Sequence, residues 1–380
     1  MKTRDRILWA LAGVAFLVGS VGLVQRMLTG HINAAYGSYV PWGLWVGMYT
    51  MLVGMSVGAF LLASVILAFR IERLAGVVRP ALVVAVATFG GGMLAVWLDL
   101  GDPLLAWRLY LATGFTSIMG WMAWLYAAYA VVLAIVAWLV IWRGRTSASP
   151  AVQRLGVLGA LLAIVFGGSE GALFGVVGAR DFWHSGLTPI LFLVEGALSG
   201  IALVTVVALL FSLVTDQVAR ILGRVVLGAL LAAIVIEFAE LSIGIYASIP
   251  AYAASVDLVL RGPYWWAFWI IHALLGVAVP LVLLVFASGR RWAIAGATSL
   301  IAATALSTKL NLVIAAQAVP EFEELRVAYT GPGLRFDYFP TLMEWLVGLW
   351  ILAVVAIVVL AGHWALSRRP ASFSQATDVP

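Results

Sequence analysis

Ten long apolar runs, separated by short charged or Pro/Gly-rich joints, constrain this chain more than any other feature. A helix needs about 20 apolar residues to cross the hydrocarbon core of a bilayer, and every run reaches that length. Backbone groups in hydrocarbon must be satisfied internally, and no run alternates as a barrel strand does, so the runs predict helices. The predicted spans are residues 7–29, 42–69, 80–100, 114–142, 153–178, 188–215, 225–248, 264–288, 292–318 and 340–366.

Composition supports this all-α polytopic membrane fold. The 380 residues are 64% hydrophobic and 10% charged, whereas a soluble domain has roughly 25% charged residues. The whole chain, 1–380, is expected to be one integral membrane domain, and the charged start MKTRDR indicates an uncleaved first span. The longest external loop covers about 319–339, and residues 367–380 are expected to form a disordered cytoplasmic tail.

Lysine and arginine predict the orientation, because cytoplasmic joints carry an excess of both. With the N-terminus inside, fifteen of these residues lie at cytoplasmic joints and six on the opposite side. Both termini are then cytoplasmic, as an even number of spans requires. The protein is expected in the inner (cytoplasmic) membrane.

The metal-ligating residues exclude several classes of electron carrier. The chain has no cysteine, so it holds neither a thiolate-ligated iron–sulfur cluster nor a covalently attached haem. Of four histidines, only His272 lies well inside a predicted span, which argues against a di-haem cytochrome. No metal site is expected, and any metal centres that exchange electrons with this chain must belong to a partner.

Buried ionisable residues gather in the outer half of the predicted spans. Such residues are expensive in a membrane and therefore mark candidate functional sites. Glu170 and Glu195 fall roughly 10–12 Å below the outer surface by helix rise, whereas the inner halves are nearly pure Ala, Val, Leu and Ile. The others with this bias are Asp99, Glu237, Glu240, His272, Lys309, Asn311 and Glu344.

Each of these residues also has a purely structural interpretation. Lys309 could form a neutralised pair with Glu240 or Glu344 as readily as serve a function, and Glu195 could hydrogen-bond a neighbouring helix backbone. His272, which follows the sequence PYWWAFWII, is more typical of a packed interfacial histidine than of a ligand. The argument for function therefore rests on their concentration at one depth and on one side.

The stretch from His31 to Leu62 combines a polar loop with a helix rich in glycine and amphipathic aromatics. Gly43, Gly47, Gly54 and Gly58 predict close helix packing within the first bundle. Apolar, aromatic and partly charged outer cavities suit a quinone, whose ring stacks on Trp or Tyr while a carboxylate exchanges its proton. The outer turns of this helix are expected to form one wall of a quinone pocket.

Several segments together resemble the NrfD/PsrC polysulfide-reductase-type membrane subunits. These are PWGLWVGMYTMLVGMSVGAFLL, WLDLGDPLLAWRL, TSIMGWMAWLYAAY and SEGALFGVVGARDFWHSGLTPILFLVEGALSG. The ending, KLNLVIAAQAVPE followed by YFPTLMEWLVGL, is similar to the ten-helix branch with HybB and DsrP-like subunits.

The resemblance implies two four-helix bundles, 42–178 and 188–318. The first helix with its external loop (1–41) and the segment 319–366 flank them. It further implies a quinone, menaquinone or ubiquinone, on the outer side, beside a ferredoxin-like iron–sulfur subunit and a catalytic molybdopterin or hydrogenase-type subunit. By position, the resemblance implies that four residues exchange protons with the quinone: Tyr49, Asp99, Glu170 and His184. Those carried over as quinone contacts are His31, Asn33, Trp42, Tyr49, Arg108, Ser117 and Trp121.

The predicted function is quinone/quinol exchange and membrane anchoring for a respiratory oxidoreductase, with no catalysis by this chain alone. Proton-transfer candidates are Glu195, Glu240, Lys309 and Glu344. Two alternatives are an ion-coupled secondary transporter and a purely structural anchor. A transporter commonly has helices broken near the midplane, which the apolar runs here do not show, and an anchor has no need of carboxylates and aromatics at one depth.

Overall fold

The computed structural model describes residues 2–246, 249–328, 331 and 333–368. In this described part of the chain there is no strand, and ten helices are long and apolar enough to cross a membrane. The predicted fold class and the predicted ten spans are confirmed. The spans are α1 Thr3–Thr29, α2 Leu44–Ala68, α3 Ala75–Asp99 preceded by η1 Glu72–Leu74, α5 Ile118–Ala137 continued by η3 Trp138–Trp142, α6 Pro150–Gly175, α7 Thr188–Leu210, α8 Asp216–Tyr246, η4 Ala267–Ala278 continued by α10 Val279–Phe286, α11 Arg291–Ala318 and α13 Leu342–Ser367.

Short helices lie at the end of the molecule opposite the termini. They are η2 Pro103–Leu105, α4 Arg108–Leu111, α9 Pro250–Arg261 and α12 Leu325–Ala328. Proline fixes several helix starts, because its missing N–H is one of the donors that a first turn leaves unpaired. Pro150 and Pro250 occupy such positions in α6 and α9. Of the predicted tail, residues 369–380 lie outside the described part of the chain.

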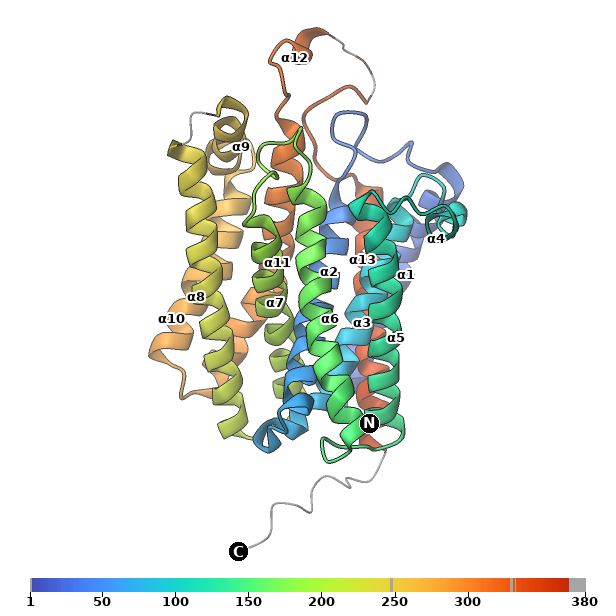
Figure 1. Cartoon of the computed structure of the whole chain (residues 1–380), viewed down its shortest axis with the longest axis vertical. Coiled ribbons are helices and arrows are strands. Elements are labelled where there is room, and N and C mark those ends of the chain that lie inside the picture. Colours follow the sequence, from blue (N-terminus) through green and yellow to red (C-terminus); the bar gives the residue numbers. More distant parts are fainter. Residues whose placement is uncertain (1, 247–248, 329–330, 332, 369–380) are drawn as a thin grey trace, which may run out of the picture.

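We call α2, α3, α5 and α6 the first group, and α7, α8, η4 with α10, and α11 the second (Figure 1). The two groups pack closely together, because α7 contacts α2 and α6 as well as α8 and α11. The first and last spans, α1 and α13, pack along each other, and α13 also contacts α3. Helix α2 is buried along nearly its whole length and contacts α7, so it is the centre of the molecule.

Glycine contacts join the two groups. The Cα of Gly196 in α7 lies 3.3 Å from where a Cβ on Gly54 would stand, and a Cβ on Gly58 would overlap the carbonyl oxygen of Gly196. Gly47 faces Leu310 of α11 instead. The prediction that these glycines pack within the first bundle was therefore wrong. Gly54 and Gly58 allow α2 to approach α7 at backbone distance, as small residues do between membrane helices. Gly43 meets the ring of Tyr338 instead.

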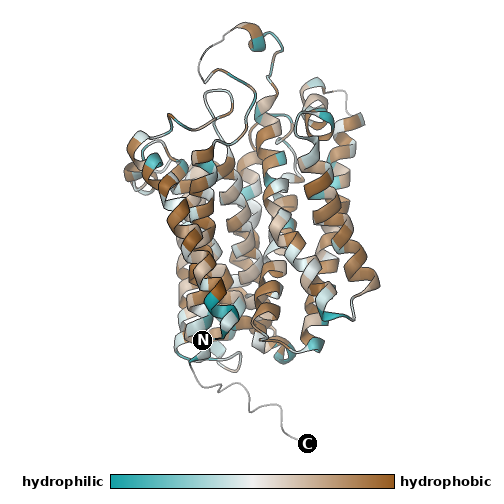
Figure 2. Cartoon of the chain, turned by 180° about the vertical axis from the view of Figure 1, so that it is seen from behind, coloured by the Kyte–Doolittle hydropathy of each residue, from teal (hydrophilic) through white to brown (hydrophobic). Residues whose placement is uncertain are grey.

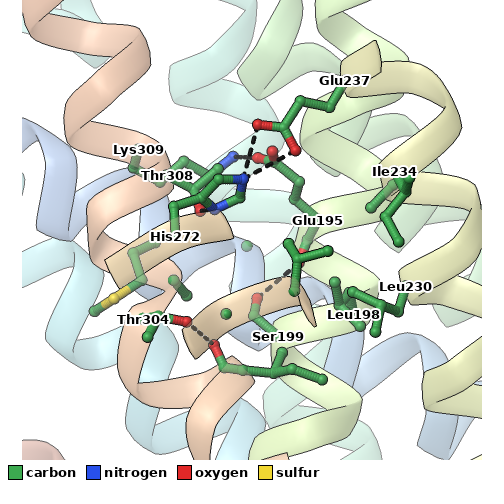
Figure 3. Close-up of a pocket in the computed structure, with 17 residues that line it drawn as sticks. Glu195, Leu198, Ser199, Leu230, Ile234, Glu237, His272, Thr304, Thr308 and Lys309 are labelled. Carbon is green, nitrogen blue, oxygen red and sulfur yellow. Dashed lines mark hydrogen bonds and ion pairs between the residues drawn. The ribbon is translucent and has the colours of Figure 1, made fainter. Parts of the chain in front are cut away.

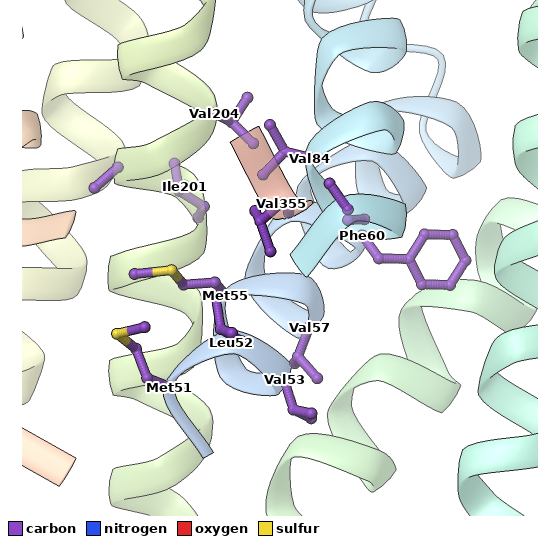
Figure 4. Packing of buried hydrophobic residues seen from close by; sticks show 14 of the residues in the cluster. Met51, Leu52, Val53, Met55, Val57, Phe60, Val84, Ile201, Val204 and Val355 are labelled. Carbon is purple, nitrogen blue, oxygen red and sulfur yellow. The ribbon is translucent and has the colours of Figure 1, made fainter. Parts of the chain in front are cut away.

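Hydropathy follows the arrangement expected for a bilayer. Figure 2 shows hydrophobic residues along the length of the helices and hydrophilic residues gathered at their two ends. The buried core runs through the junction of the two groups, where Met51 and Met55 of α2 point toward the side of α7 that carries Ile201 (Figure 4). Large apolar side chains such as Leu17 and Val235 are exposed on the outward faces, where lipid replaces water.

Replacing Gly58 by Ala should destabilise the chain by about 1–3 kcal/mol, because the added methyl meets the α7 backbone, which cannot move aside cheaply. The thermal unfolding midpoint of the purified protein in detergent measures this loss. Gly90→Ala is the matched control, since nothing lies within 4 Å of its Cβ position. Equal midpoints for the two variants would contradict the α2–α7 contact.

Candidate functional site

Glu170 is the most deeply buried carboxyl of the first group, at 1% exposure on α6. Its Oε1 is buried and has no hydrogen-bond partner among the described residues. A buried polar atom left unpaired costs free energy, about 1–3 kcal/mol for a neutral group. An unpaired carboxyl oxygen inside a membrane helix bundle is therefore the atom that most needs a further partner.

Two hydrogen bonds made by tyrosine hydroxyls lie in the same group of helices as Glu170. The hydroxyl of Tyr49 on α2 hydrogen-bonds the hydroxyl of Tyr126 on α5. Tyr129, one turn further along α5, shares a hydrogen bond of 2.9 Å with Ser56. The ring of Phe166, one turn before Glu170, packs against Tyr126 and Tyr129 with centroid separations of 4.9 and 4.6 Å.

Trp42 lies in the turn that leads into α2. Its ring stacks on Trp183 at a centroid distance of 5.5 Å and meets the edge of Phe174. Its backbone N–H donates to Gln317 Oε1 at 3.0 Å, and Gln317 Nε2 donates to the Trp42 carbonyl at 2.9 Å. These reciprocal bonds attach the start of α2 to α11, so that Trp42 joins the two groups.

The loop after α1 forms a second polar cluster with the C-terminal end of α3. Tyr36 donates to Asp99 Oδ1 at 3.3 Å, and the His31 ring lies 5.2 Å from the Tyr36 ring. Arg26 donates to the carbonyls of Leu98 and Leu100, at 2.9 and 2.6 Å, where the α3 dipole favours a cation. The structure thus brings His31 and Asp99 together through Tyr36.

The pKa values of two side chains in this loop, His31 and Tyr36, are shifted from their ordinary values. Burial, and then the positive charge of Arg26, lowers the pKa of His31, so the imidazole is neutral at neutral pH. Its Nε2 is buried without a partner among the described residues. Burial, followed by the charge of Asp99, raises the pKa of Tyr36, which stays protonated and able to donate.

Glu344, a proton-transfer candidate, is fully occupied by structural hydrogen bonds. It forms a capping box with Thr341 at the start of α13. Its carboxyl also accepts from Tyr338 at 2.5 Å and from the Ala35 backbone N–H at 2.9 Å. Tyr338 in turn accepts from the Leu44 N–H at 2.6 Å. Glu344 thereby fastens the loops before α2 and α13 to each other.

The structure places the remaining predicted quinone-site residues outside both polar clusters. Trp121 is 54% exposed and donates to the Phe115 carbonyl at the start of α5. Arg108 lies over the ring of its neighbour Trp107, and Ser117 precedes α5 without a capping bond from its side chain. His184 is exposed and contacts the Gly175 carbonyl at 2.9 Å, and Asn33 donates to Thr29.

The second group holds a chain of paired charges (Figure 3). Lys309 donates to Glu195 at 2.7 Å, and its ammonium group lies 3.7 Å from the centre of the Phe192 ring. His272 contacts Glu237 at 2.8 Å on one ring nitrogen and Thr308 at 2.8 Å on the other. The predicted partners of Lys309, Glu240 and Glu344, were wrong, because Glu195 of α7 occupies that position.

Two small cavities meet at these charges. Glu195, Glu237 and Thr308 line both of them, with volumes of about 40 and 60 Å³, enough for a few water molecules. The larger one extends to Glu240, which accepts from Ser185 at 2.6 Å and from Tyr252 at 2.9 Å. Polar groups thus continue from the loop before α7 to the middle of the second group.

Sequence reasoning missed the side chains that complete these clusters. Tyr126, Tyr36 and Gln317 were not singled out, although each is a polar residue in or next to an apolar run. That position was the available signal. No spacing rule joins Tyr36 to Asp99 or Gln317 to Trp42, because the partners are far apart in the chain and meet only by packing.

Comparison with known proteins places the chain in a family. Residues 33–321 match the family model described as polysulphide reductase, NrfD. A selenate reductase subunit of Mesobacillus selenatarsenatis is 27% identical, with 90% of this chain and 89% of the relative covered. The Hdr-like menaquinol oxidoreductase integral membrane subunit of Archaeoglobus fulgidus is 27% identical over 85% and 84% of the two chains.

A third relative is the integral membrane subunit of menaquinone reductase from Nitratidesulfovibrio vulgaris. It is 22% identical, with 87% of this chain and 84% of the relative covered. The chain belongs to the NrfD family of multi-pass integral membrane subunits of respiratory oxidoreductases. The resemblance seen in the sequence is confirmed at the level of the family.

Removing one partner of the Glu195–Lys309 pair should destabilise the chain by about 3–5 kcal/mol, because the other charge stays buried and unpaired. Lys309→Met and Glu195→Gln are the single variants, and their combination should recover much of the loss. Unfolding in detergent and denaturant measures all three. Asp257→Asn at the exposed Asp257–Arg261 pair is the control and should cost little; additive losses in the double variant would contradict the pairing.

Proposed function

We propose that this chain exchanges electrons between a membrane quinone and an iron–sulfur subunit docked on its extracytoplasmic face. The observation that carries the proposal is the buried, unpaired carboxyl oxygen of Glu170, in the same bundle as the Tyr49–Tyr126 pair. The relatives named as menaquinol oxidoreductase and menaquinone reductase subunits support a quinone as the substrate class. The family match favours this function over a secondary transporter or a purely structural anchor.

The residues of the first group suit a quinone in their chemistry. Flat apolar rings favour aromatic walls, which Phe166 and Phe89 supply beside the tyrosines. A quinol releases two electrons and two protons on oxidation. The role proposed for Glu170 is to accept one such proton through its unpaired oxygen, while Tyr49 holds the other polar edge through its hydroxyl.

The outer cluster of His31, Tyr36 and Asp99 is proposed to orient the same substrate at the membrane surface. The unpaired ring nitrogen of a neutral His31 can donate a hydrogen bond to a carbonyl or accept one from a hydroxyl, depending on which ring nitrogen carries the proton. Trp42 at the start of α2 completes this outer wall in the proposal. Arg108, Ser117, Trp121, His184 and Asn33, which lie at the same end of the bundle, are proposed to contact the partner or the entry route.

The assembly, branch and orientation of this chain are proposed on separate grounds. Reductase membrane subunits among the relatives support a complex with a ferredoxin-like subunit and a catalytic molybdopterin or hydrogenase-type subunit. Ten spans and the ending YFPTLMEWLVGL support the ten-helix HybB/DsrP-like branch. Cytoplasmic termini in the inner membrane are supported by the arginine distribution and by the first and last helices ending on one side (Figure 1).

Glu170→Gln should slow quinol turnover by about 10²–10⁴-fold, the range for losing an acid–base group, with assembly intact. Tyr49→Phe should slow turnover less, because it removes only a hydrogen bond to the substrate, again with assembly intact. Quinol-dependent reduction of the complex's terminal acceptor measures the rate, and purification of the whole complex measures assembly. Ser169→Ala is the control on the same helix, because its hydroxyl bonds only the Val165 carbonyl. Unchanged turnover in both variants would leave the purely structural anchor as the better account.

Proton exchange is proposed to occur with the outer side alone, through Glu195, Glu240 and Lys309, with Glu344 as the remaining candidate. The inner turns of the spans are nearly all apolar, so no polar route toward the other face is proposed. Proteoliposomes containing the complex should therefore build no membrane potential during quinol oxidation. A potential that a protonophore abolishes would refute outer-side exchange while leaving the quinone site in place.

A further inference from the structure

A cavity of about 290 Å³ lies at the end of the bundle where α1 begins and α13 ends. It opens among the last turns of α2 and α13, the first turns of α3 and the loop after η3. We call it the inner cavity. It is distant in the fold from Glu170, Asp99 and the charges of the second group, which occupy the outer halves of their helices, and no residue of the proposed quinone site lines it.

The polar lining of the inner cavity has one sign of charge. Its polar residues are Arg79, Arg145, Ser147, His363 and Ser367. No carboxylate is among the described residues that line it. The nearby Asp5 lines the adjoining cavity and is already paired with Arg4 at 3.0 Å. The inner cavity therefore attracts an anion, and arginine in particular matches phosphate geometry.

His363 provides a second, independent indication of a ligand. Its ring stacks on Phe211 at a centroid distance of 3.8 Å, which fixes the ring against the end of α7. Its Nδ1 is buried and has no hydrogen-bond partner among the described residues. A buried ring nitrogen on the wall of an arginine-lined cavity is a donor site for an anionic oxygen when that nitrogen carries the proton.

The rest of the lining is apolar. Leu67 of α2, Val140 of η3 and Leu366 of α13 represent this part. The same turns of η3 and α13 also carry large exposed side chains, Trp142 and Trp364, so the apolar wall lies beside a lipid-facing surface. A soluble anion gains nothing from such a wall, whereas a lipid has an acyl chain to place along it. Basic pockets between membrane helices at the cytoplasmic side are known to hold lipid headgroups.

We propose that the inner cavity binds an anionic phospholipid, with its phosphate between Arg79 and Arg145 and one acyl chain along the apolar wall. His363 donates to a phosphate oxygen from the α13 side. Because the cavity contacts the ends of α2, α3 and α13, a bound lipid also fastens the flanking helix to the first group. The proposal is independent of the quinone site and can fail without affecting it.

Native mass spectrometry of the delipidated full chain, titrated with phosphatidylglycerol or with phosphatidylcholine of the same acyl chains, tests the proposal. We expect one tightly bound phosphatidylglycerol and much weaker binding of phosphatidylcholine. Arg145→Gln should weaken phosphatidylglycerol binding about fivefold, which is the effect expected for one arginine at a membrane surface. Arg145 is exposed, so this change should not affect folding. Arg79→Gln should weaken binding by the same factor. Arg143→Gln is the matched control, because Arg143 lies over Trp138, 4.8 Å from the ring centre, and does not line the cavity.

Three results would overturn the proposal. Equal affinity for the two lipids, or affinity unchanged by both arginine variants, removes the charge recognition. Competition by inorganic phosphate at concentrations comparable to those of the lipid would make the cavity a soluble-anion site. Lipid binding seen only in a chain shortened to end at Arg368 would show that the protein's own C-terminal segment is the occupant.

Discussion

The close approach of α2 and α7 is the contact on which the rest of the molecule depends. Gly54 and Gly58 face Gly196 with no side chain between them, so two groups of helices pack at backbone distance around α2. In lipid, where apolar tails compete equally for apolar side chains, such close packing supplies most of the attraction between helices. It also fixes the height of Tyr49 on α2 relative to Glu195 on α7.

The buried charged residues of the two groups differ in whether they have hydrogen-bond or ion-pair partners. In the second group Glu195 and Lys309 neutralise each other, and His272 bridges Glu237 and Thr308, so these polar groups have partners. In the first group the carboxyl of Glu170 keeps an unpaired oxygen. The contrast distinguishes charges that are paired with one another from a carboxyl oxygen without a partner among the described residues, and it is why the quinone role is proposed for the first group.

Hydrogen bonds hold the loops before α2 and α13 in place. Glu344, Tyr338 and the Ala35 N–H connect the loop before α2 to the start of α13, and Gln317 holds Trp42 to α11. These bonds fix His31, Tyr36 and Trp42 above the bundle without any regular secondary structure. A rigid outer face of this kind suits a surface on which an electron-transfer partner docks, because distance governs that transfer.

The sequence by itself determined the number and type of spans, the absence of cysteine ligands and the family. It also predicted the bounds of the spans to within five residues, except that α8 begins nine residues earlier than predicted. Those features follow from apolar length and local composition, which packing does not change. The sequence also singled out Glu170, Glu195 and Lys309, because a charged residue within an apolar run can be recognised without knowing the fold. Only the tertiary structure decided which partner each charge meets: Lys309 pairs with Glu195, Glu344 caps α13, and the α2 glycines face the second group. Partners of this kind come from helices far apart in the chain, and their register is set by side-chain packing that no local pattern encodes.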